Sequence, residues 1–169
     1  MPGGFAAYRR KAPVTFALKC FTVALIGSAL YSNNNNQQPA AMPIVKIEVC
    51  RARPAEQVSA LIEAVYQAQL IALKLPEDDK QIRYVEHKPE HFPVPPGKTE
   101  NYTFVEFQIF PGRSLEAKRK LYQGVVHRFG ELGIQPSDII IVLHEPSLEN
   151  WGIRGLPASE INLGFNLNV

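Results

Sequence analysis

The stretch PIVKIEVC at residues 43–50 alternates apolar and polar side chains, and YTFVEFQIF at residues 102–110 does the same. Such alternation is typical of a strand that buries one face against a core. The two stretches belong to a longer correspondence, because a shift of 60 residues superimposes one on the other and Arg53 on Arg113. The sequence therefore predicts that residues 43–169 contain one structural unit written twice.

A helical pattern follows each of these strands. Apolar residues recur at helical spacing over Ala55 to Leu73 and again over Leu115 to Leu132. Ser114 is suited to cap the start of the second helix, and Gly133 is placed to end it. Each half therefore continues from a strand into a helix.

A Pro-x-Asp turn then leads to a second predicted strand in each half, at Gln81 to His87 and at Asp138 to Glu145. Each half is thus a β-α-β unit with parallel strands and a right-handed crossover. The predicted fold class is α+β, with two tandem units forming a four-stranded sheet and both helices on one face. The proline-rich stretch 87–97 is expected to join the halves as a stiff loop.

The sheet face away from the predicted helices also carries apolar side chains, which we expect to be buried. Its outward positions include Ile44 and Phe104, so we expect other subunits there rather than water. An alternating run over 161–167 predicts a last strand, which has no partner inside its own unit and is a candidate for pairing across a subunit boundary.

The composition argues against several classes of protein. Four of the 18 basic residues and none of the 16 acidic ones precede residue 43, which leaves 14 basic and 16 acidic residues in the rest of the chain. A protein that binds the phosphate backbone of nucleic acid needs the opposite balance. Two cysteines make no disulfide framework, and the four histidines lack metal-ligand spacing. We expect no metal and no other cofactor.

Residues 1–42 differ from the remainder and are expected to form a leader ahead of a domain at 43–169. A basic head at 9–11 precedes an apolar run, and a tract rich in asparagine and glutamine follows. Three interpretations stay open: a secretory signal, an organelle transit peptide, or an unused upstream start with Met42 as the working initiator. The first two place the protein outside the cell or in an organelle, and the third in the cytoplasm. Lys19 interrupts the short run, so no stable membrane span is expected.

Pro43 directly follows Met42, the second of only two methionines. If Met42 initiates translation and is removed, Pro43 begins the mature chain as a secondary amine. The pKa of an α-amino group is about 7.7–8.0 in peptides, and burial or a nearby cation lowers it. Such a base can move a proton from a carbon beside a carbonyl. The alternative is that Pro43 merely opens a strand, with an amide nitrogen that cannot act as a base.

Arg113 lies between a predicted strand and a predicted helix, where a guanidinium can hold a carboxylate with two hydrogen bonds. The alternative is an arginine that pairs with Glu116 or with another subunit. Asp78 and Asp79 follow Pro76 and could orient water, or could simply cap a turn.

A few further residues could contact a substrate. Trp151 and Ile153 lie in a loop bounded by glycines and could wall a pocket, or could fill a gap between subunits. Tyr84 and His87 are candidates for polar groups in the pocket, or are ordinary residues at a strand end. Arg154 could be a second carboxylate partner or a surface residue.

The chain resembles the tautomerase superfamily, which has the fold of 4-oxalocrotonate tautomerase and macrophage migration inhibitory factor. The resemblance covers 43–169 and rests on the doubled plan, on MPIVK at 42–46 and on GRSLEAK at 112–118. The tail, ENWGIRG at 149–155 and PASE at 157–160, is most similar to the malonate semialdehyde decarboxylase-like branch.

The resemblance implies a homotrimer without cofactors, in which an amino-terminal proline acts at each site. On this basis Pro43 would be the general base or acid and Arg113 the carboxylate-binding arginine. Asp79 would match the aspartate that activates water in the decarboxylase, and Trp151 a tryptophan that lines the pocket. The decarboxylase of this branch carries Arg-Pro-Arg, whereas this chain reads PGR at 111–113, so its first arginine is missing.

Three hypotheses follow. The first is a tautomerase that acts on small 2-oxo or enol carboxylic acids, because isomerisation needs only a proton carrier and a cation. The second is a decarboxylase or hydratase of a small 3-oxo acid with Asp79 activating water. The third is a non-catalytic trimeric binding module, or a ferredoxin-like regulatory domain if the protein is not trimeric.

Overall fold

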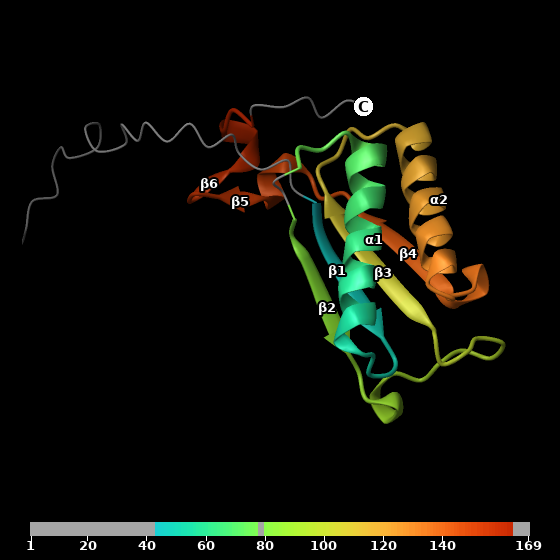
Figure 1. Cartoon of the computed structure of the whole chain (residues 1–169). Helices are drawn as coiled ribbons and strands as arrows, with labels where there is room; N and C mark the ends of the chain where they lie inside the picture. Colours follow the sequence, from blue (N-terminus) through green and yellow to red (C-terminus); the bar gives the residue numbers. More distant parts are fainter. Residues whose placement is uncertain (1–42, 78–79, 164–169) are drawn as a thin grey trace, which may run out of the picture. The chain divides into compact units, whose positions relative to one another are not determined.

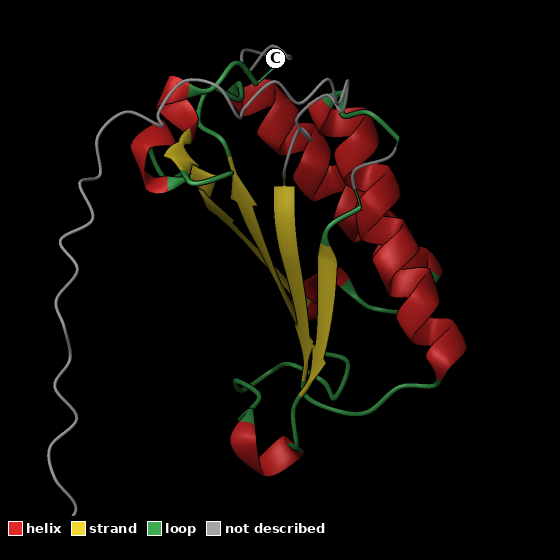
Figure 2. Ribbon diagram, turned by 90° about the vertical axis from the view of Figure 1, so that its left-hand side faces the viewer, coloured by secondary structure: helices red, strands yellow, loops and turns green. Residues whose placement is uncertain are grey.

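The computed structural model describes residues 43–77 and 80–163. Four strands form one sheet in the order β2-β1-β3-β4, and the two long helices lie side by side on one face of it (Figures 1 and 2). These elements are β1 (Pro43–Val49), α1 (Ala55–Leu73), β2 (Ile82–Glu86), β3 (Thr103–Ile109), α2 (Leu115–Glu131) and β4 (Ile139–His144).

Short elements complete the described chain. They are the 3-10 turns η1 (Pro89–His91), η2 (Pro136–Asp138), η3 (Leu148–Asn150) and η4 (Ala158–Glu160), and the two-residue strands β5 (Gly152–Ile153) and β6 (Leu156–Pro157).

The strand directions confirm the two predicted units. β1 runs parallel to β2, and β3 runs parallel to β4, whereas the two central strands β1 and β3 are antiparallel. Each unit is therefore a β-α-β motif, and the two units meet through their antiparallel inner strands in the middle of the sheet. The predicted α+β class with both helices on one face is confirmed, and within the two β-α-β units each predicted strand and helix end lies within one residue of the observed one.

The core lies between the sheet and the helices. Val45, Ile47 and Val49 alternate along β1 and are completely buried, as the period of two in the sequence predicts. They pack with apolar side chains of β3 and of both helices, among them Phe107 and Phe129. This single cluster supplies most of the buried apolar surface that drives folding.

The ends of α2 form as expected. The Ser114 hydroxyl accepts a hydrogen bond from the Ala117 N–H at 3.1 Å, which satisfies one free donor of the first turn. Beyond the helix, Gly133 takes a φ of 80° and its N–H donates to the Gly130 carbonyl. A left-handed residue of this kind ends many helices, and glycine adopts the conformation without strain.

The two helices approach closely at one point. A Cβ atom added to Gly124 of α2 would lie 3.3 Å from the Cβ of Ala68 on α1. Small residues on both sides therefore permit this contact, whereas Gly130, on the same helix, has no neighbour within 4 Å of such an atom.

The sheet face away from the helices is mixed. Ile44, Phe104 and Val142 are half-buried there, and Ile140 is 37% exposed. Lys46 forms ion pairs with Glu48 at 2.8 Å and Glu106 at 2.6 Å. The hydrogen bonds to Glu106 and Glu48 raise the pKa of Lys46.

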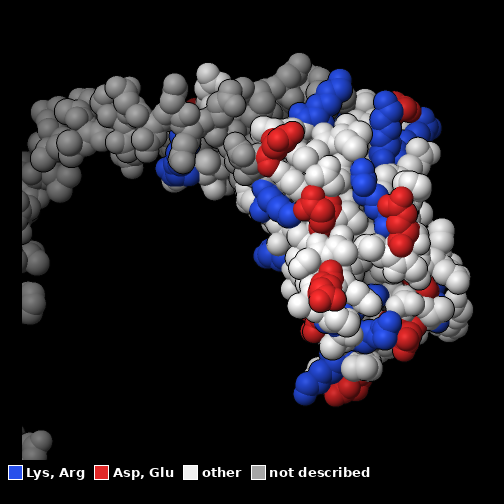
Figure 3. All heavy atoms as spheres, in the orientation of Figure 1, with Lys and Arg blue, Asp and Glu red and all other residues white. Residues whose placement is uncertain are grey.

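Charges of both signs are interspersed over the molecular face seen in Figure 3, where Lys and Arg side chains alternate with Asp and Glu. Within the residues that the structure describes, no helix is long and apolar enough to cross a membrane.

The described part of the tail packs on the body of the chain. After β5 and β6, Leu163 packs with Phe110, Trp151 and Ala158 in a second apolar cluster, and residues 161–163 form no strand within one chain. Pairing of the tail across a subunit boundary stays a prediction. The rest of the predicted strand, 164–167, lies outside the described residues.

Candidate active site

Pro43 lies where several chain segments meet at one end of the sheet. It is buried, and it opposes Ile109, the last residue of β3. Because β1 and β3 are antiparallel, the start of β1 lies beside the ends of β3 and of β4, which is parallel to β3. Phe110, Arg113 and Trp151 also belong to this end of the sheet.

Arg113 follows β3 and is only 7% exposed. Its Nε atom is buried without a hydrogen-bond partner, and its guanidinium makes no ion pair with any described residue. Burial lowers the pKa of Arg113, and the negative charge of Glu145 acts in the opposite direction. An unpaired buried cation costs free energy, so this position favours an incoming anion.

The acidic residues near Arg113 have other partners. Glu145, directly after β4, accepts a hydrogen bond from the Lys118 ammonium. Glu116, the partner that the sequence offered as an alternative, lies 3.7 Å from Lys120 instead. Glu145 was not predicted, although its place at the end of the strand beside β3 was a usable signal.

Trp151 lies in the apolar cluster beside this region. It is 8% exposed, its ring centroid is 4.7 Å from that of Phe110, and its Nε1–H donates to the Pro146 carbonyl at 3.2 Å. Ile44 and Ile153 pack against the same cluster. Since Ile44 adjoins Pro43 in the chain, the structure brings Pro43, Arg113, Trp151 and Ile153 to one end of the sheet.

Arg154 occupies the turn between β5 and β6. Its φ is 53°, in the left-handed region, and Gly155 follows with a φ of 84°. The turn leaves Arg154 exposed, so the structure does not bring it to Arg113 as a second carboxylate partner.

His87 lies elsewhere. Its backbone N–H donates a hydrogen bond to the carbonyl of Val49, the last residue of β1. His87 therefore lies at the far end of β1, roughly 20 Å from Pro43 at the usual rise of a strand. Its Nε2 is 3.7 Å from Glu48 and its ring is 5.0 Å from that of Phe92. Within one chain His87 therefore lies far from Pro43, and its role as a polar group in the pocket stays a prediction.

The parallel pairing of β1 and β2 explains the position of His87. In a β-α-β unit the end of the second strand lies beside the end of the first, far from its start. Asp78 and Asp79 lie outside the described residues, so the position of the expected water-activating Asp79 stays a prediction.

The described residues contain no group of three or more His, Cys, Asp or Glu side chains that could hold a metal ion. The arrangement instead combines a buried cation, an apolar wall and the start of a strand. It is suited to bind a small anion with an apolar part.

Comparisons with known proteins agree with this geometry. A family model described as "Tautomerase enzyme" matches residues 79–154. The probable tautomerase YusQ of Bacillus subtilis (strain 168) is 26% identical over 116 residues, which cover 65% of this chain and 91% of that protein.

Solved structures share the fold. A malonate semialdehyde decarboxylase, studied for decarboxylase and hydratase activities, is 24% identical with a TM-score of 0.59, over 64% of this chain and 88% of that one. A fused 4-OT, described as an asymmetric trimer, is 15% identical with a TM-score of 0.63, over 69% and 97%.

Proposed function

We propose that the chain is a member of the tautomerase superfamily and a cofactor-independent tautomerase of small 2-oxo or enol carboxylic acids, as the family match and the similarity to YusQ support. One observation carries the proposal: the buried, unpaired guanidinium of Arg113 lies at the end of the sheet where β1 begins with Pro43. A carboxylate bound to Arg113 would place the adjoining carbons of the substrate near the Pro43 nitrogen.

The proposal requires that Pro43 be the first residue of the working protein. In a chain that retains residues 1–42, the Pro43 nitrogen is part of an amide and holds no proton to exchange. Removal of the preceding residues would create a secondary amine at the end of the sheet that also receives Arg113, and burial or a nearby cation lowers the pKa of an amine. The amine then exchanges protons close to neutral pH.

The reaction moves one proton and one double bond. For an enol substrate such as phenylenolpyruvate, protonated Pro43 gives its proton to carbon 3 while the enol hydroxyl releases its own proton to solvent, and Pro43 then takes up a proton from solvent for the next turnover. The electron pair of the carbon–carbon double bond forms the new C–H bond, and the oxygen pair closes the carbonyl at carbon 2. Arg113 holds the carboxylate throughout, and Trp151 and Phe110 exclude water from the apolar part.

We further propose that the protein is a homotrimer that acts on such acids without a cofactor. The trimeric fused 4-OT with the same fold supports this assembly, as do the apolar side chains on the sheet face away from the helices. Ile44 and Phe104, which are half-buried in one chain, would be covered by neighbouring copies.

The test is ketonisation of phenylenolpyruvate by protein that starts at Pro43, with the start verified by intact mass. We expect Pro43→Ala to reduce the rate about 100-fold or more, because the proton carrier changes. Arg119→Ala is the matched control, because Arg119 is exposed on α2 and should leave the rate unchanged.

Two results would overturn the proposal. One is a Pro43→Ala variant as active as the parent, and the other is full activity in protein that retains residues 1–42. Decarboxylation ranks lower because Gly112 stands where the decarboxylase branch carries its first arginine. Release of CO2 from malonate semialdehyde, abolished in Asp79→Asn, would support that reaction instead.

A further inference from the structure

The opposite end of the sheet carries the repeat counterpart of the candidate active site. The shift of 60 residues that relates the two units places Arg53 on Arg113 and Thr103 on Pro43. Since β1 and β3 are antiparallel, the two sets lie at opposite ends of the central strands. Arg53 thus follows the end of β1, beside the start of β3.

Arg53 resembles Arg113 because it, too, has no ion pair among the described residues and no partner for its buried Nε atom. Its side chain has one hydrogen bond that meets normal geometric limits, a long one of 3.4 Å from Nη2 to the Asn101 carbonyl, and a further one to the Tyr84 hydroxyl that does not meet those limits. A guanidinium supported this weakly retains most of its donors for an anion.

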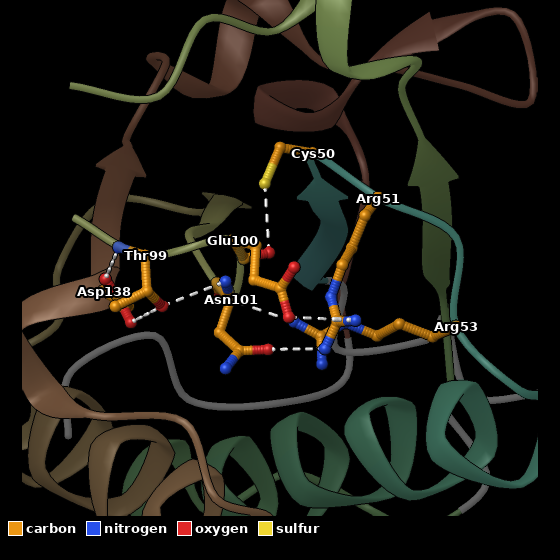
Figure 4. A network of polar contacts seen from close by, with 7 residues as sticks. All are labelled: Cys50, Arg51, Arg53, Thr99, Glu100, Asn101 and Asp138. Atoms are coloured by element: carbon orange, nitrogen blue, oxygen red, sulfur yellow. Dashed lines mark hydrogen bonds and ion pairs between the residues drawn. The ribbon is translucent and has the colours of Figure 1, made fainter.

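The neighbouring charges do not neutralise Arg53. In Figure 4 its side chain and that of Arg51 meet at Asn101 and Glu100. Arg51 forms an ion pair with Glu100 at 3.2 Å and donates a hydrogen bond to the Asn101 side-chain oxygen at 3.0 Å. Glu86 contacts only the backbone of Arg53, by accepting from its N–H at 3.1 Å.

Tyr84 adds a further unused donor. It lies on β2 opposite Ile47, and its hydroxyl is buried without a hydrogen bond that meets normal geometric limits. Burial raises the pKa of Tyr84 to about 12, while the charge of Arg53 opposes that rise. The phenol is therefore protonated at neutral pH, and the Arg53 guanidinium is close enough to affect its pKa.

We propose that this end of the sheet, with Arg53 and Tyr84, is a second binding site for a small carboxylate, and that it binds the acid without converting it. The guanidinium supplies two parallel donors to the carboxylate oxygens, and the Tyr84 hydroxyl supplies a third. Turnover cannot occur there, because Thr103 lies inside the chain and its nitrogen is an amide. Each chain would then carry one reactive and one silent site.

The test is an NMR titration of ¹⁵N-labelled protein that starts at Pro43, with pyruvate as the probe and chloride at equal ionic strength as the reference. We expect pyruvate to shift two separate groups of amide signals, one around Ser114 and one around Asn101 and Thr103. Arg53→Gln should abolish the second group only, and Arg113→Gln the first group only.

Two variants separate binding from folding. Tyr84→Phe should weaken pyruvate binding at the second group several-fold while the thermal midpoint stays near that of the parent. Arg83→Gln is the matched control, because Arg83 is exposed on the same strand and should keep both groups of shifts.

The inference is overturned if pyruvate shifts only the signals near Arg113, or if chloride produces the same shifts around Asn101. It is also overturned if Arg53→Gln changes the oligomeric state but leaves both groups intact, since Arg53 would then serve an interface between copies. The titration measures binding and not turnover, so its outcome is independent of catalysis. A protein that is inactive but shows both groups of shifts would refute the proposed function and support the second site.

Discussion

At the scale of single residues, Arg113 is the most informative position in the chain. It combines nearly complete burial with the absence of an ion pair inside the described residues. A side chain selected only for stability would not be left in this state, because replacing a buried charge by an apolar group of similar size is often neutral or stabilising. The state of this guanidinium therefore supports the proposed binding of a carboxylate.

The first prediction concerns this guanidinium. Arg113→Met should raise the KM for phenylenolpyruvate about 10-fold to 100-fold, since a charged hydrogen bond contributes about 1.5–3 kcal/mol. Arg113→Lys should recover part of the loss, because lysine retains the charge but not the fork of donors. Steady-state kinetics of both variants, beside Arg119→Ala, measure these effects.

The same variant also tests the cost of the buried charge. In urea unfolding without substrate, Arg113→Met should be at least as stable as the parent. A variant that loses several kcal/mol, with KM unchanged, would show that Arg113 is a structural residue, contrary to the proposed role.

The second prediction concerns Asp138, which is completely buried at the end of η2. Its carboxylate accepts from the Thr99 N–H at 2.8 Å and from the Thr99 hydroxyl at 2.5 Å. Burial acts to raise the pKa of Asp138, but the hydrogen bonds from Thr99 outweigh it and the pKa is lowered. The folded state thus binds its proton less readily than the unfolded state, and the contribution to stability is lost as pH falls through the lowered pKa.

Asp138→Asn should therefore destabilise the protein by about 1–3 kcal/mol at pH 7. The difference from the parent should shrink as the pH falls below about 4, where the parent carboxylate takes up a proton as well. Urea unfolding over this pH range measures the difference, with the exposed Glu90→Gln as control. A difference that stays constant with pH would contradict the assignment.

At the scale of elements, hydrophobic periodicity and capping residues were enough to predict the bounds of β1 and α2 from the sequence. The alternation in 43–50 was enough to define β1, because one face of that strand is completely buried. Ser114 and Gly133 marked the ends of α2, because each supplies a local hydrogen bond or backbone conformation that few other residues provide.

Features that depend on contacts distant in sequence were harder to predict. The alternation after residue 160 has the period of a strand, and within one chain Leu163 packs against Phe110 and Trp151. His87 was a candidate for the pocket on the basis of residue type, and within one chain the parallel unit places it at the far end of β1 from Pro43. Periodicity identifies a buried face but not the segment that covers it.

The third prediction concerns the contact between α1 and α2. Gly124→Val should destabilise the protein by about 1–3 kcal/mol, because the added atoms meet Ala68 and the helices must separate. Gly130→Val, on the same helix but without neighbours, should be close to neutral, and thermal unfolding of the pair compares them directly. Equal effects at both positions would show that helix propensity, and not packing, governs this helix.

At the scale of the whole molecule, the uncovered face of the sheet determines what the chain needs from other copies. Ile140 is 37% exposed there, beside the half-buried Phe104 and Val142. Lys46 forms ion pairs with Glu48 and Glu106 on the same face, so these charges are paired within the chain. A surface of this kind suits burial against a second subunit.

The fourth prediction concerns assembly. Light scattering should give the mass of three chains for the parent protein, and Ile140→Glu should reduce it, because a charge would be buried in the interface. Ile71→Glu is the matched control, since Ile71 is 67% exposed on α1 on the helix side and should leave the trimer intact. A monomeric parent, or equal effects of both substitutions, would contradict the proposed trimer.

The antiparallel contact of β1 with β3 joins the two halves of the chain. The inner strand of each half pairs with its own outer strand on one side and with the inner strand of the other half on the other side. A polypeptide of half this length would therefore need a second copy of itself to complete the same four-stranded sheet, and both copies would then begin with the same residue. In this chain the counterpart of Pro43 is Thr103, whose nitrogen lies inside the polypeptide, so the proposed chemistry is open to one half only.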